Sequence, residues 1–177
     1  ADALHKLGLK VTLLQRADRL MNAQLDEQGA AKLAGYLESI GIQVVTNASV
    51  SRYEGQPQWQ EAWLSHGPRV RADLFVACLG IQANTYLAEQ AGLQLADNGI
   101  QVDAQMRSSD PHIYAVGDVA ELKGTPRGLW PIGAAHAATA VASMLGEAVP
   151  YATPRIVLQL KCEGIDLRCQ GETVARE

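Results

Sequence analysis

The sequence predicts an α/β fold in which short parallel strands alternate with helices. Three observations support this prediction. Residues 1–7 form a helical pattern that leads through a tight turn to an apolar strand at 11–14, which is the second half of a strand–helix–strand unit. The long helical pattern at 25–40 is followed directly by another strand at 42–46. Residues 113–116 form an apolar run closed by a glycine, a pattern typical of a parallel strand that is buried on both faces.

The first half of the chain contains the clearest helix. Asp26 is placed to cap the helix at 25–40. Its apolar stripe consists of Ala30, Leu33, Leu37 and Ile40. The stretch 48–70 changes to short alternating runs broken by glycine-proline turns, which predicts an antiparallel meander rather than a crossover helix. Trp59 and Trp63 lie within it, and we expect them to pack on the sheet rather than to stack on a ligand.

The second half of the chain continues the pattern of short strands and helices. Residues 73–79 are predicted to form another buried strand, in which Cys78 is a small buried hydrophobic residue. A short helix is predicted at 85–91, and the Asn-Gly pair at 98–99 predicts a hairpin turn. A helix rich in small residues is predicted at 132–145, directly after a proline.

Composition and charge restrict the class of protein. The 177 residues are 47% hydrophobic and carry a net charge of −4, which suits one globular domain or two small ones. No basic stripe is present, so no nucleic-acid partner is expected. No apolar run of about 18 residues and no signal-peptide pattern is present, so no membrane segment is expected. Cys78, Cys162 and Cys169 form neither a C-x-x-C pair nor a zinc site, which predicts no metal and suits a reducing cytoplasm.

The main functional signal lies at 109–118. The apolar run at 113–116 is followed by Gly117 and Asp118, so the carboxylate is expected at the carboxyl end of a strand, where ligands bind in open α/β sheets. Glycine allows a ligand to approach the backbone, and a carboxylate accepts hydrogen bonds from ligand hydroxyls. From these residues alone, a turn cap and a ligand site are equally good interpretations of Asp118.

The segment 107–120, RSSDPHIYAVGDVA, resembles the second FAD-binding motif of the two-dinucleotide flavoprotein reductases. That family includes rubredoxin and ferredoxin reductases, NADH-dependent nitrite reductases and the pyridine nucleotide-disulfide oxidoreductases. The resemblance implies that Asp118, presented by Gly117, binds the ribityl hydroxyls of FAD. It covers nearly the whole chain and implies a Rossmann-like, three-layer ββα fold that binds two dinucleotides. We expect this fold to be incomplete at both ends, because neither glycine-rich fingerprint occurs in the sequence.

The resemblance also assigns a role to the helix at 132–145. In the family this helix directs its amino terminus at the pyrimidine edge of the flavin, where the positive end of the helix dipole favours the reduced anion. By position, Gly133 and Ala134 would offer backbone N–H groups. Relatives often carry glutamine or glutamate where this chain has His136, which we expect to be structural. Gly80 ends a segment similar to the one that closes the NAD domain of the family.

Nucleotide choice is expected to depend on Gln15 and Arg16, which follow the strand at 11–14. Relatives that use NADH usually carry glutamate at the first of these positions, because a carboxylate binds the ribose hydroxyls and repels a 2′-phosphate. Gln15 keeps the hydrogen bond and lacks the repulsion, while Arg16 and Arg19 could reach a phosphate. The residues therefore predict use of NADH with tolerance of NADPH.

The resemblance implies three domains and one activity. Residues 1–82 would be the carboxyl-terminal part of an NAD(P)-binding domain, 83–150 the second segment of an FAD-binding domain, and 151–177 the start of a small interface domain. The implied activity is that of a flavin-dependent NAD(P)H oxidoreductase, which passes hydride from nicotinamide to FAD and electrons to an acceptor protein or small molecule. We expect the chain alone to be inactive, and its unpaired strand edges to favour a homo-oligomer. A nucleotide-binding fragment without turnover and a flavin-free dehydrogenase are the alternatives.

Overall fold

The computed structural model describes residues 1–56, 60–147, 149–160, 162 and 164–170. The chain divides into two compact units. The first comprises Ala1–Ala77 together with Val157–Glu177, and the second comprises Cys78–Ile156. Each unit contains its own cluster of buried apolar side chains, so each has a separate hydrophobic core.

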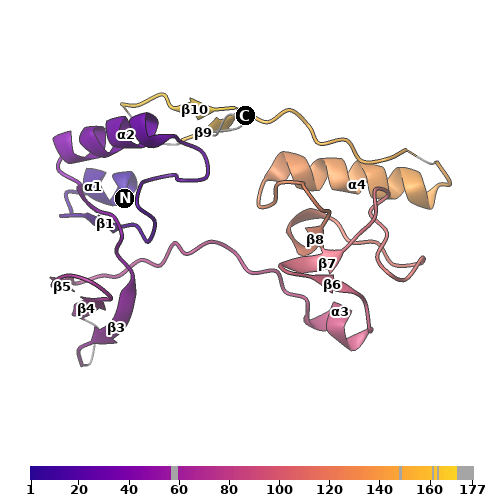
Figure 1. Cartoon of the computed structure of the whole chain (residues 1–177), viewed down its shortest axis with the longest axis horizontal. Coiled ribbons are helices and arrows are strands. Elements are labelled where there is room, and N and C mark those ends of the chain that lie inside the picture. The colour runs from indigo at the N-terminus through magenta and orange to yellow at the C-terminus, as the bar shows by residue number, and fades with distance from the viewer. Residues whose placement is uncertain (57–59, 148, 161, 163, 171–177) are drawn as a thin grey trace. The chain divides into compact units, whose positions relative to one another are not determined.

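A parallel strand–helix–strand unit forms the centre of the first compact unit (Figure 1). β1 (Thr12–Leu14) pairs in parallel with β2 (Gln43–Val45), and α2 (Glu27–Ser39) connects the two strands. The carboxylate of Asp26 accepts the N–H of Gly29 at 2.8 Å and so caps α2. The sequence prediction of a capped helix between two parallel strands is therefore confirmed.

The core of the first unit lies between α2, the β1–β2 pair and a carboxyl-terminal hairpin. Its buried members are Leu20, Leu33, Leu37 and Ile42. The hairpin consists of β9 (Leu158–Gln159) and β10 (Arg168–Cys169), which pair antiparallel. Leu160 and Leu167 of this hairpin pack against the same cluster. A short helix, α1 (Asp2–Lys6), precedes β1 without a side-chain cap. Segments from the two ends of the sequence thus share one core.

The predicted antiparallel meander follows the strand–helix–strand unit. It consists of β3 (Val50–Glu54), β4 (Glu61–Leu64) and β5 (Arg69–Arg71), paired in that order. Burial alternates along β4, where Ala62 and Leu64 are buried and the residues between them are more accessible. This alternation is the pattern of a sheet with one apolar face and one polar face.

Trp63 lies on the polar face of the meander, between two arginines. The guanidinium groups of Arg52 and Arg69 lie 4.9 and 4.6 Å from the centroid of its ring. The indole N–H donates to Oε2 of Glu54 at 2.9 Å. Trp63 thus packs on the sheet as predicted, whereas Trp59 lies outside the described residues.

Glu61 joins the same polar face through two arginines. Its carboxylate accepts hydrogen bonds from Arg71 at 2.6 Å and from Arg69 at 3.2 Å. The bond from Arg71, followed by that from Arg69, holds the pKa of Glu61 below its ordinary value of 4.5. A carboxyl group with a lowered pKa in the folded state stabilises the fold above its unfolded-state pKa, and this stabilisation is lost as the pH falls through the folded-state value.

We therefore expect Glu61→Gln to lower the thermal unfolding midpoint at neutral pH. The difference from the unsubstituted chain should shrink as the pH falls below 4.5. Circular dichroism melting curves over a series of pH values measure this. Glu27→Gln, on the exposed first turn of α2, is the control for loss of a carboxylate without these arginine contacts. A difference for Glu61→Gln that is independent of pH would contradict the assignment.

The stretch 73–79 is not the buried strand that the sequence predicts. It is extended without a ladder partner among the described residues, and Leu74, Val76 and Leu79 are 63%, 58% and 94% exposed. Cys78 is also exposed, so its prediction as a small buried hydrophobic residue is wrong. An apolar run becomes a buried strand only where neighbouring strands supply backbone hydrogen bonds and cover both faces. No described residue supplies them here.

The second compact unit consists of a small mixed sheet and two helices (Figure 1). Its elements are α3 (Tyr86–Gln90), β6 (Leu95–Ala96), β7 (Gly99–Gln101), η1 (Gly117–Val119), β8 (Ala120–Glu121) and α4 (Trp130–Met144). β6 and β7 form the predicted hairpin, and β7 also pairs in parallel with β8. Within the described residues, this parallel pair joins segments about 20 residues apart and places η1 at the edge of the sheet.

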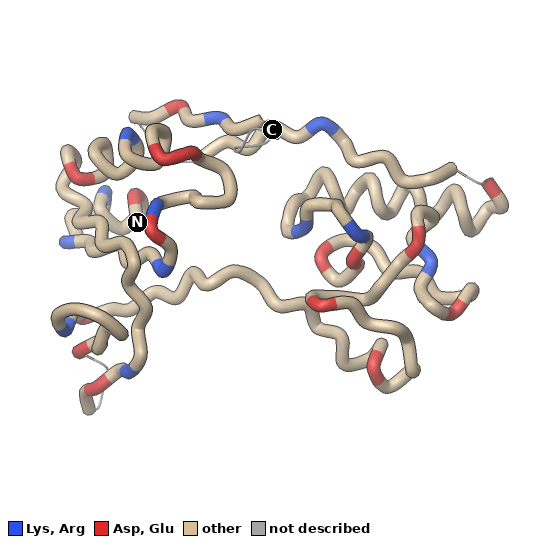
Figure 2. Tube along the Cα trace, viewed as in Figure 1, with Lys and Arg blue, Asp and Glu red and all other residues tan. Residues whose placement is uncertain are grey.

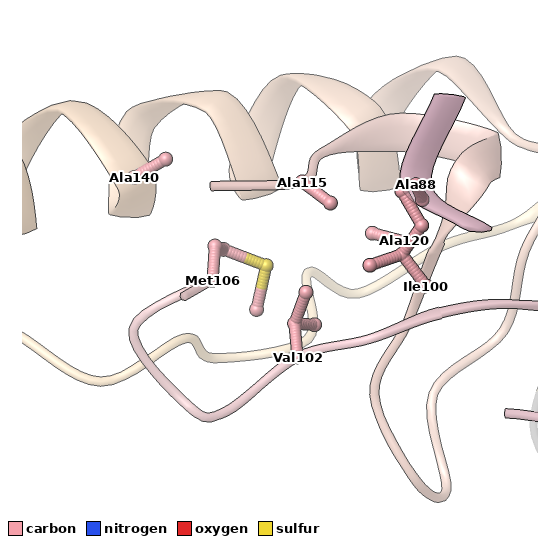
Figure 3. Close-up of a cluster of buried hydrophobic side chains, with 7 residues drawn as sticks. All are labelled: Ala88, Ile100, Val102, Met106, Ala115, Ala120 and Ala140. Atoms are coloured by element: carbon pink, nitrogen blue, oxygen red, sulfur yellow. The ribbon is translucent and has the colours of Figure 1, made fainter. Parts of the chain in front are cut away.

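Four alanines, one isoleucine, one valine and one methionine form the core of the second unit (Figure 3). The cluster consists of Ala88, Ile100, Val102, Met106, Ala115, Ala120 and Ala140. Met106 is fully buried and has a φ of 64°, in the left-handed region that residues other than glycine seldom adopt. Ala140 belongs to α4 and Ala115 to the segment that precedes η1, so small residues allow these two backbones to approach.

Residues 113–116 do not form the predicted parallel strand. Tyr114 makes an isolated antiparallel bridge with Arg107, and the N–H of Ala115 donates to the carbonyl of Met106 at 3.1 Å. The turn that precedes this run brings the chain back on itself, so these backbone groups are satisfied locally. The parallel strand of this region is instead β8, which begins at Ala120. Asp118 therefore precedes a parallel strand rather than following one.

Candidate functional site

The candidate site is built on η1, a single 3-10 turn between the Tyr114 bridge and β8. Gly117 opens this turn with a φ of +72°, a conformation that glycine adopts without steric cost. A Cβ built on Gly117 would meet no heavy atom within 4 Å, so the backbone conformation rather than lack of space requires glycine here. The turn presents the side chain of Asp118 to solvent.

The carboxylate of Asp118 is held by the loop that precedes α4. Its Oδ1 accepts the backbone N–H of Gly128 at 3.2 Å. No partner is recorded for Oδ2 among the described residues, so this oxygen can accept a hydrogen bond from a ligand hydroxyl. Asp118 is thus oriented by a backbone group while one acceptor atom stays accessible.

Gly80 lies near the same loop through its neighbour Ile81. A Cβ built on Gly128 would lie 3.6 Å from Cδ1 of Ile81, so the two segments are in van der Waals contact. Gly80 itself is exposed and has a φ of +94°, which again suits glycine. The structure therefore brings Gly80 to the neighbourhood of the Asp118 loop, although no recorded contact joins Gly80 to Asp118 directly.

The first turns of α4 lie against η1. A Cβ built on Gly133 would lie 3.4 Å from the Cα of Gly117, so the helix and the turn approach closely because neither position carries a side chain. The N–H of Gly133 donates to the carbonyl of Leu129 at 3.2 Å, within the helix. Ala134 follows on the exposed side. Pro131 has no N–H, and the N–H of Ile132 also donates to the carbonyl of Leu129 at 3.0 Å, so among the first residues of α4 only Trp130 has an N–H without an intrahelical acceptor. The ligand role of the Gly133 and Ala134 N–H groups stays a prediction.

His136 lies on the buried side of α4, one turn after Gly133. It is 0% exposed, and its ring packs edge-to-face on that of Tyr151 with the centroids 4.7 Å apart. Neither ring nitrogen has a hydrogen-bond partner among the described residues that meets ordinary geometric limits. Burial lowers the pKa of His136, and the nearby backbone carbonyl of Gly117 partly opposes that shift. The imidazole is therefore neutral at neutral pH.

Gln15 and Arg16 belong to the other compact unit and follow β1 directly. The N–H of Gln15 donates to the carbonyl of Val45 at 2.8 Å, and its carbonyl accepts the N–H of Ala48 at 2.9 Å. These bonds continue the pairing beyond the carboxyl ends of β1 and β2. Gln15 is half-buried and Arg16 is exposed, so this polar tip lies at the edge of a parallel sheet where nucleotides bind.

Arg19 differs from Arg16 in being engaged by its neighbours. Its guanidinium pairs with the carboxylate of Asp18 at 3.1 Å and donates to the carbonyl of Leu25 at 3.3 Å. An open hollow of about 300 Å³ lies beside this segment. It is lined by Asp18, Arg19, Leu20, Glu27, Ala30, Ala31, Ala34 and Thr46. Arg16 is therefore the better candidate for a phosphate contact at this strand end.

The structure thus brings together only part of the predicted set. Gly117, Asp118 and Gly133 lie in one place, while Gln15 and Arg16 lie in the other unit. Gly128, which orients Asp118, was not among the predicted site residues. The loop between Asp118 and the proline of α4 is rich in glycine, threonine and proline. This composition predicts a turn but does not predict that the N–H of Gly128 binds Asp118.

Other kinds of site find no support in the described part of the chain. Among the described residues, no group of three or more histidine, cysteine, aspartate or glutamate side chains is placed to hold a metal ion. None of the helices described is both long and apolar enough to cross a membrane. In both units, lysine and arginine alternate with aspartate and glutamate along the trace rather than forming a basic stripe (Figure 2).

The chain is similar to proteins of known family. The model of the protein family described as pyridine nucleotide-disulphide oxidoreductase matches residues 1–149 of the chain. The chain is 31% identical to the nitrite reductase [NAD(P)H] large subunit of Klebsiella oxytoca over 99% of its length. It is also 31% identical to the nitric oxide reductase FlRd-NAD(+) reductase of Pectobacterium atrosepticum over 98% of its length.

A solved structure shows the same architecture. The NAD-dependent persulfide reductase from A. fulgidus matches 92% of the chain with a TM-score of 0.82 and 28% identity. This similarity confirms the predicted α/β fold. The chain spans 18% and 46% of the lengths of the two sequence relatives and 31% of the structural one.

Proposed function

Because the chain belongs to the pyridine nucleotide-disulphide oxidoreductase family, we propose that it supplies parts of the flavin site and of the nicotinamide-nucleotide site of an FAD-dependent NAD(P)H oxidoreductase. One observation carries the proposal. The turn at Gly117 and Asp118 packs on α4 with its carboxylate held by the N–H of Gly128 and one carboxylate oxygen accessible. This arrangement suits a ligand that bears several hydroxyl groups.

The residues fit one portion of FAD and not the others. A Cβ built on Gly117 would meet no heavy atom within 4 Å, so the space beside this turn is open to a ligand. Asp118 supplies the acceptor that ribityl hydroxyls need. A pyrophosphate requires several backbone N–H groups on a glycine-rich turn, and no G-x-G-x-x-G occurs in the 177 residues. The residues of this site therefore fit the ribityl and ring portions of FAD.

The chain's own contribution is to bind and orient. When bound, FAD accepts a hydride from the nicotinamide and passes the electrons on, and that chemistry belongs to the cofactor. Asp118 fixes the ligand by accepting hydrogen bonds from its hydroxyls. The amino-terminal end of α4 adds a partial positive charge beside the turn, an effect of about 0.3–1 kcal/mol for a nearby anion. Gly80, beside the Gly128 loop, leaves the backbone open on the same side.

A direct experiment tests the flavin assignment. A purified protein that contains this chain should show visible flavin absorption, and NADH should bleach it. NADH oxidation without flavin bands would overturn the proposal in favour of a flavin-free dehydrogenase. Flavin bands that NADH does not bleach would instead support the second candidate, a nucleotide-binding part without turnover of its own, which the lack of a glycine-rich turn in this sequence favours.

The nicotinamide nucleotide is proposed to bind at Gln15 and Arg16. We expect NADH to be used and NADPH to be tolerated, with kcat/KM values that differ by less than about a thousandfold, since that ratio corresponds to roughly 4 kcal/mol. Arg16 is favoured over Arg19 as the contact for a 2′-phosphate, because Arg19 is already paired with Asp18. Gln15→Glu should shift the preference toward NADH by repelling the 2′-phosphate.

Steady-state kinetics with both nucleotides measure this preference. Arg16→Ala should reduce kcat/KM for NADPH by about tenfold, the value of one hydrogen bond to a charged group, and leave that for NADH nearly unchanged. Arg19→Ala is the matched control, because its guanidinium is held by Asp18 and Leu25. A native preference for NADH above a thousandfold would contradict the hypothesis, because Gln15 cannot repel a phosphate.

Three further assignments belong to this proposal. We propose that residues 1–82 form part of the NAD(P)-binding domain, 83–150 the second FAD-binding segment and 151–177 the start of an interface domain, in a homo-oligomer. The acceptor is proposed to be a redox protein or a small molecule, since the relatives are named for nitrite reduction and for the reduction of a nitric oxide reductase. A cytoplasmic location is supported by the three cysteines, none of which forms a disulfide within the described residues.

A further inference from the structure

The buried face of α4 carries a row of polar side chains. His136, Thr139 and Ser143 are all buried and recur at helical spacing. At one end of the row, Oγ of Ser143 accepts a hydrogen bond from Nε of Arg107 at 3.3 Å and lies 3.4 Å from the hydroxyl of Tyr114. This part of α4 is thereby attached to the segment that leads into η1.

His136 stands at the other end of this row and has no such partner. Its side chain is fully buried, and both ring nitrogens lack a hydrogen bond of ordinary geometry within the described chain. Buried polar groups in native proteins are nearly always paired, so an unpaired imidazole indicates a function. The ring is bounded by the ring of Tyr151 and by the turn at Gly117, which contacts the same side of α4 at Gly133.

We propose that His136 is a positioning residue for the proposed flavin site, in which its neutral imidazole donates a hydrogen bond to the carbonyl of Gly117 and holds the Gly117–Asp118 turn against α4. Only the functional meaning of this contact rests on the proposed function. The turn at Gly117 packs on α4 one helical turn before His136, where a Cβ built on Gly133 would lie 3.4 Å from the Cα of Gly117. Side chains of a helix lean toward the preceding turn, so the imidazole is directed toward this contact. The carbonyl of Gly117 also opposes the effect of burial on the pKa of His136.

Protonation of His136 would keep an N–H donor for the carbonyl of Gly117 but would place a charge inside the fold. An imidazolium would be buried without a counter-charge, since no charged side chain of the described residues contributes to the shift in its pKa. The titratable group in contact with it is Tyr151, whose buried hydroxyl also has no hydrogen-bond partner within the described residues. Asp118 is held by Gly128, and Arg107 is bonded to Ser143 further along α4. A lowered pKa means that the folded state prefers the neutral ring, so stability is lost as the pH falls below the ordinary value of 6.5. As the pH falls, the Gly117–Asp118 turn should therefore open before the rest of the second unit.

Amide hydrogen exchange on the full 177-residue chain tests the proposal without any cofactor. Protection of the η1 amides, corrected for the intrinsic effect of pH, should fall severalfold between neutral pH and about one unit below the ordinary pKa of histidine. Amides of α2 in the other unit are the internal reference. His136→Gln keeps an N–H donor and does not titrate, so its η1 protection should match the native chain at neutral pH and stay constant in acid.

His136→Leu fills the volume and removes the donor. At neutral pH it should lower the protection of η1 about fivefold relative to the native chain, the factor that corresponds to one hydrogen bond of ordinary net strength. Because leucine does not titrate, this lower protection should not change as the pH falls. Equal protection in native and leucine chains at neutral pH would overturn the proposal and leave His136 as packing alone. If the η1 protection of His136→Gln fell in acid as much as that of the native chain, the proposal would also be overturned, because another group would then cause the pH dependence.

An NMR titration of the native chain covers the case in which a variant fails to fold. The imidazole signals of His136 and the amide signal of Asp118, whose nitrogen shares its peptide bond with the carbonyl of Gly117, should move together with one apparent pKa below the ordinary value. Titration of His136 without a change in the amide signal of Asp118 would contradict the proposal. Failure of these cofactor-free measurements concerns His136 only, whereas failure of the flavin assignment would show itself in absorption spectra of the loaded protein.

Discussion

Replacing Asp118 by alanine should weaken FAD retention about tenfold or more in a flavin-loaded protein that contains this chain. A hydrogen bond between a carboxylate and a ligand hydroxyl is worth roughly 1.5–3 kcal/mol, and 1.4 kcal/mol corresponds to a factor of ten. The Gly128 N–H would also lose its acceptor, so the loop before α4 would be released. Equilibrium dialysis or flavin fluorescence quenching measures the dissociation constant.

Two variants separate the hydrogen bond from the charge. Asp118→Asn keeps one oxygen acceptor for the N–H of Gly128 and places an NH2 donor where Oδ2 lies. A ligand hydroxyl can accept from this donor without the charge, so the variant should retain FAD better than the alanine variant. Asp97→Ala removes an exposed carboxylate from the β6–β7 turn of the same unit and should leave affinity unchanged. Native affinity in Asp118→Ala would show that Asp118 only caps a turn, which is the interpretation that its sequence context leaves equally open.

The substitution Gly99→Ala is expected to destabilise the second unit by about 1–3 kcal/mol, the usual cost of forcing an extra carbon into a packed site. A Cβ at this position would lie 2.5 Å from the carbonyl oxygen of Val119 and 3.5 Å from Cβ of Glu121. The first contact is with backbone, so no side-chain rotation relieves it. Because Val119 ends η1, the strain would be transmitted to the turn that carries Asp118.

Urea unfolding followed by circular dichroism gives the change in stability. Gly35→Ala is the matched control, since Gly35 is exposed within α2 and its added Cβ would meet nothing within 4 Å. In that variant the free energy of unfolding of the first unit should rise by about 0.5–1 kcal/mol, because glycine is a poor helix former. An unchanged transition for Gly99→Ala would mean that β7 and η1 separate without cost, contrary to the contact described here.

Elements that depend on neighbours in sequence could be predicted, and those that depend on distant partners could not. The cap at Asp26 needs only residues three positions away and is as expected. The hairpin is also found, but its turn lies at 97–98, one residue before the predicted Asn-Gly pair, because Gly99 pairs with Ala96 in the ladder. The run at 113–116 has the composition of a buried strand, yet its backbone bonds to the neighbouring segment at Met106 and Arg107. Composition expresses a preference for burial but does not say which strand provides it.

The candidate site shows the same division. Gly117 and Asp118 could be found because they form one contiguous motif, and the motif specifies both the conformation and the acceptor. Gly128 could not be found, because a backbone N–H donor carries no residue-specific signal and only the folded loop places it at Asp118. The burial of His136 was equally hidden, since an alanine-rich helix gives little contrast between its two faces.

The left-handed backbone at Met106 bears on the order of events in folding. For a residue with a side chain this conformation costs about 1–2 kcal/mol, so it is rarely populated before the surrounding side chains close over it. The turn at Met106 should therefore form late, after α4 and the β6–β7 hairpin have met. Interactions that are absent from the transition state govern how slowly a protein unfolds rather than how quickly it folds. The buried methionine thus contributes to the lifetime of the folded unit.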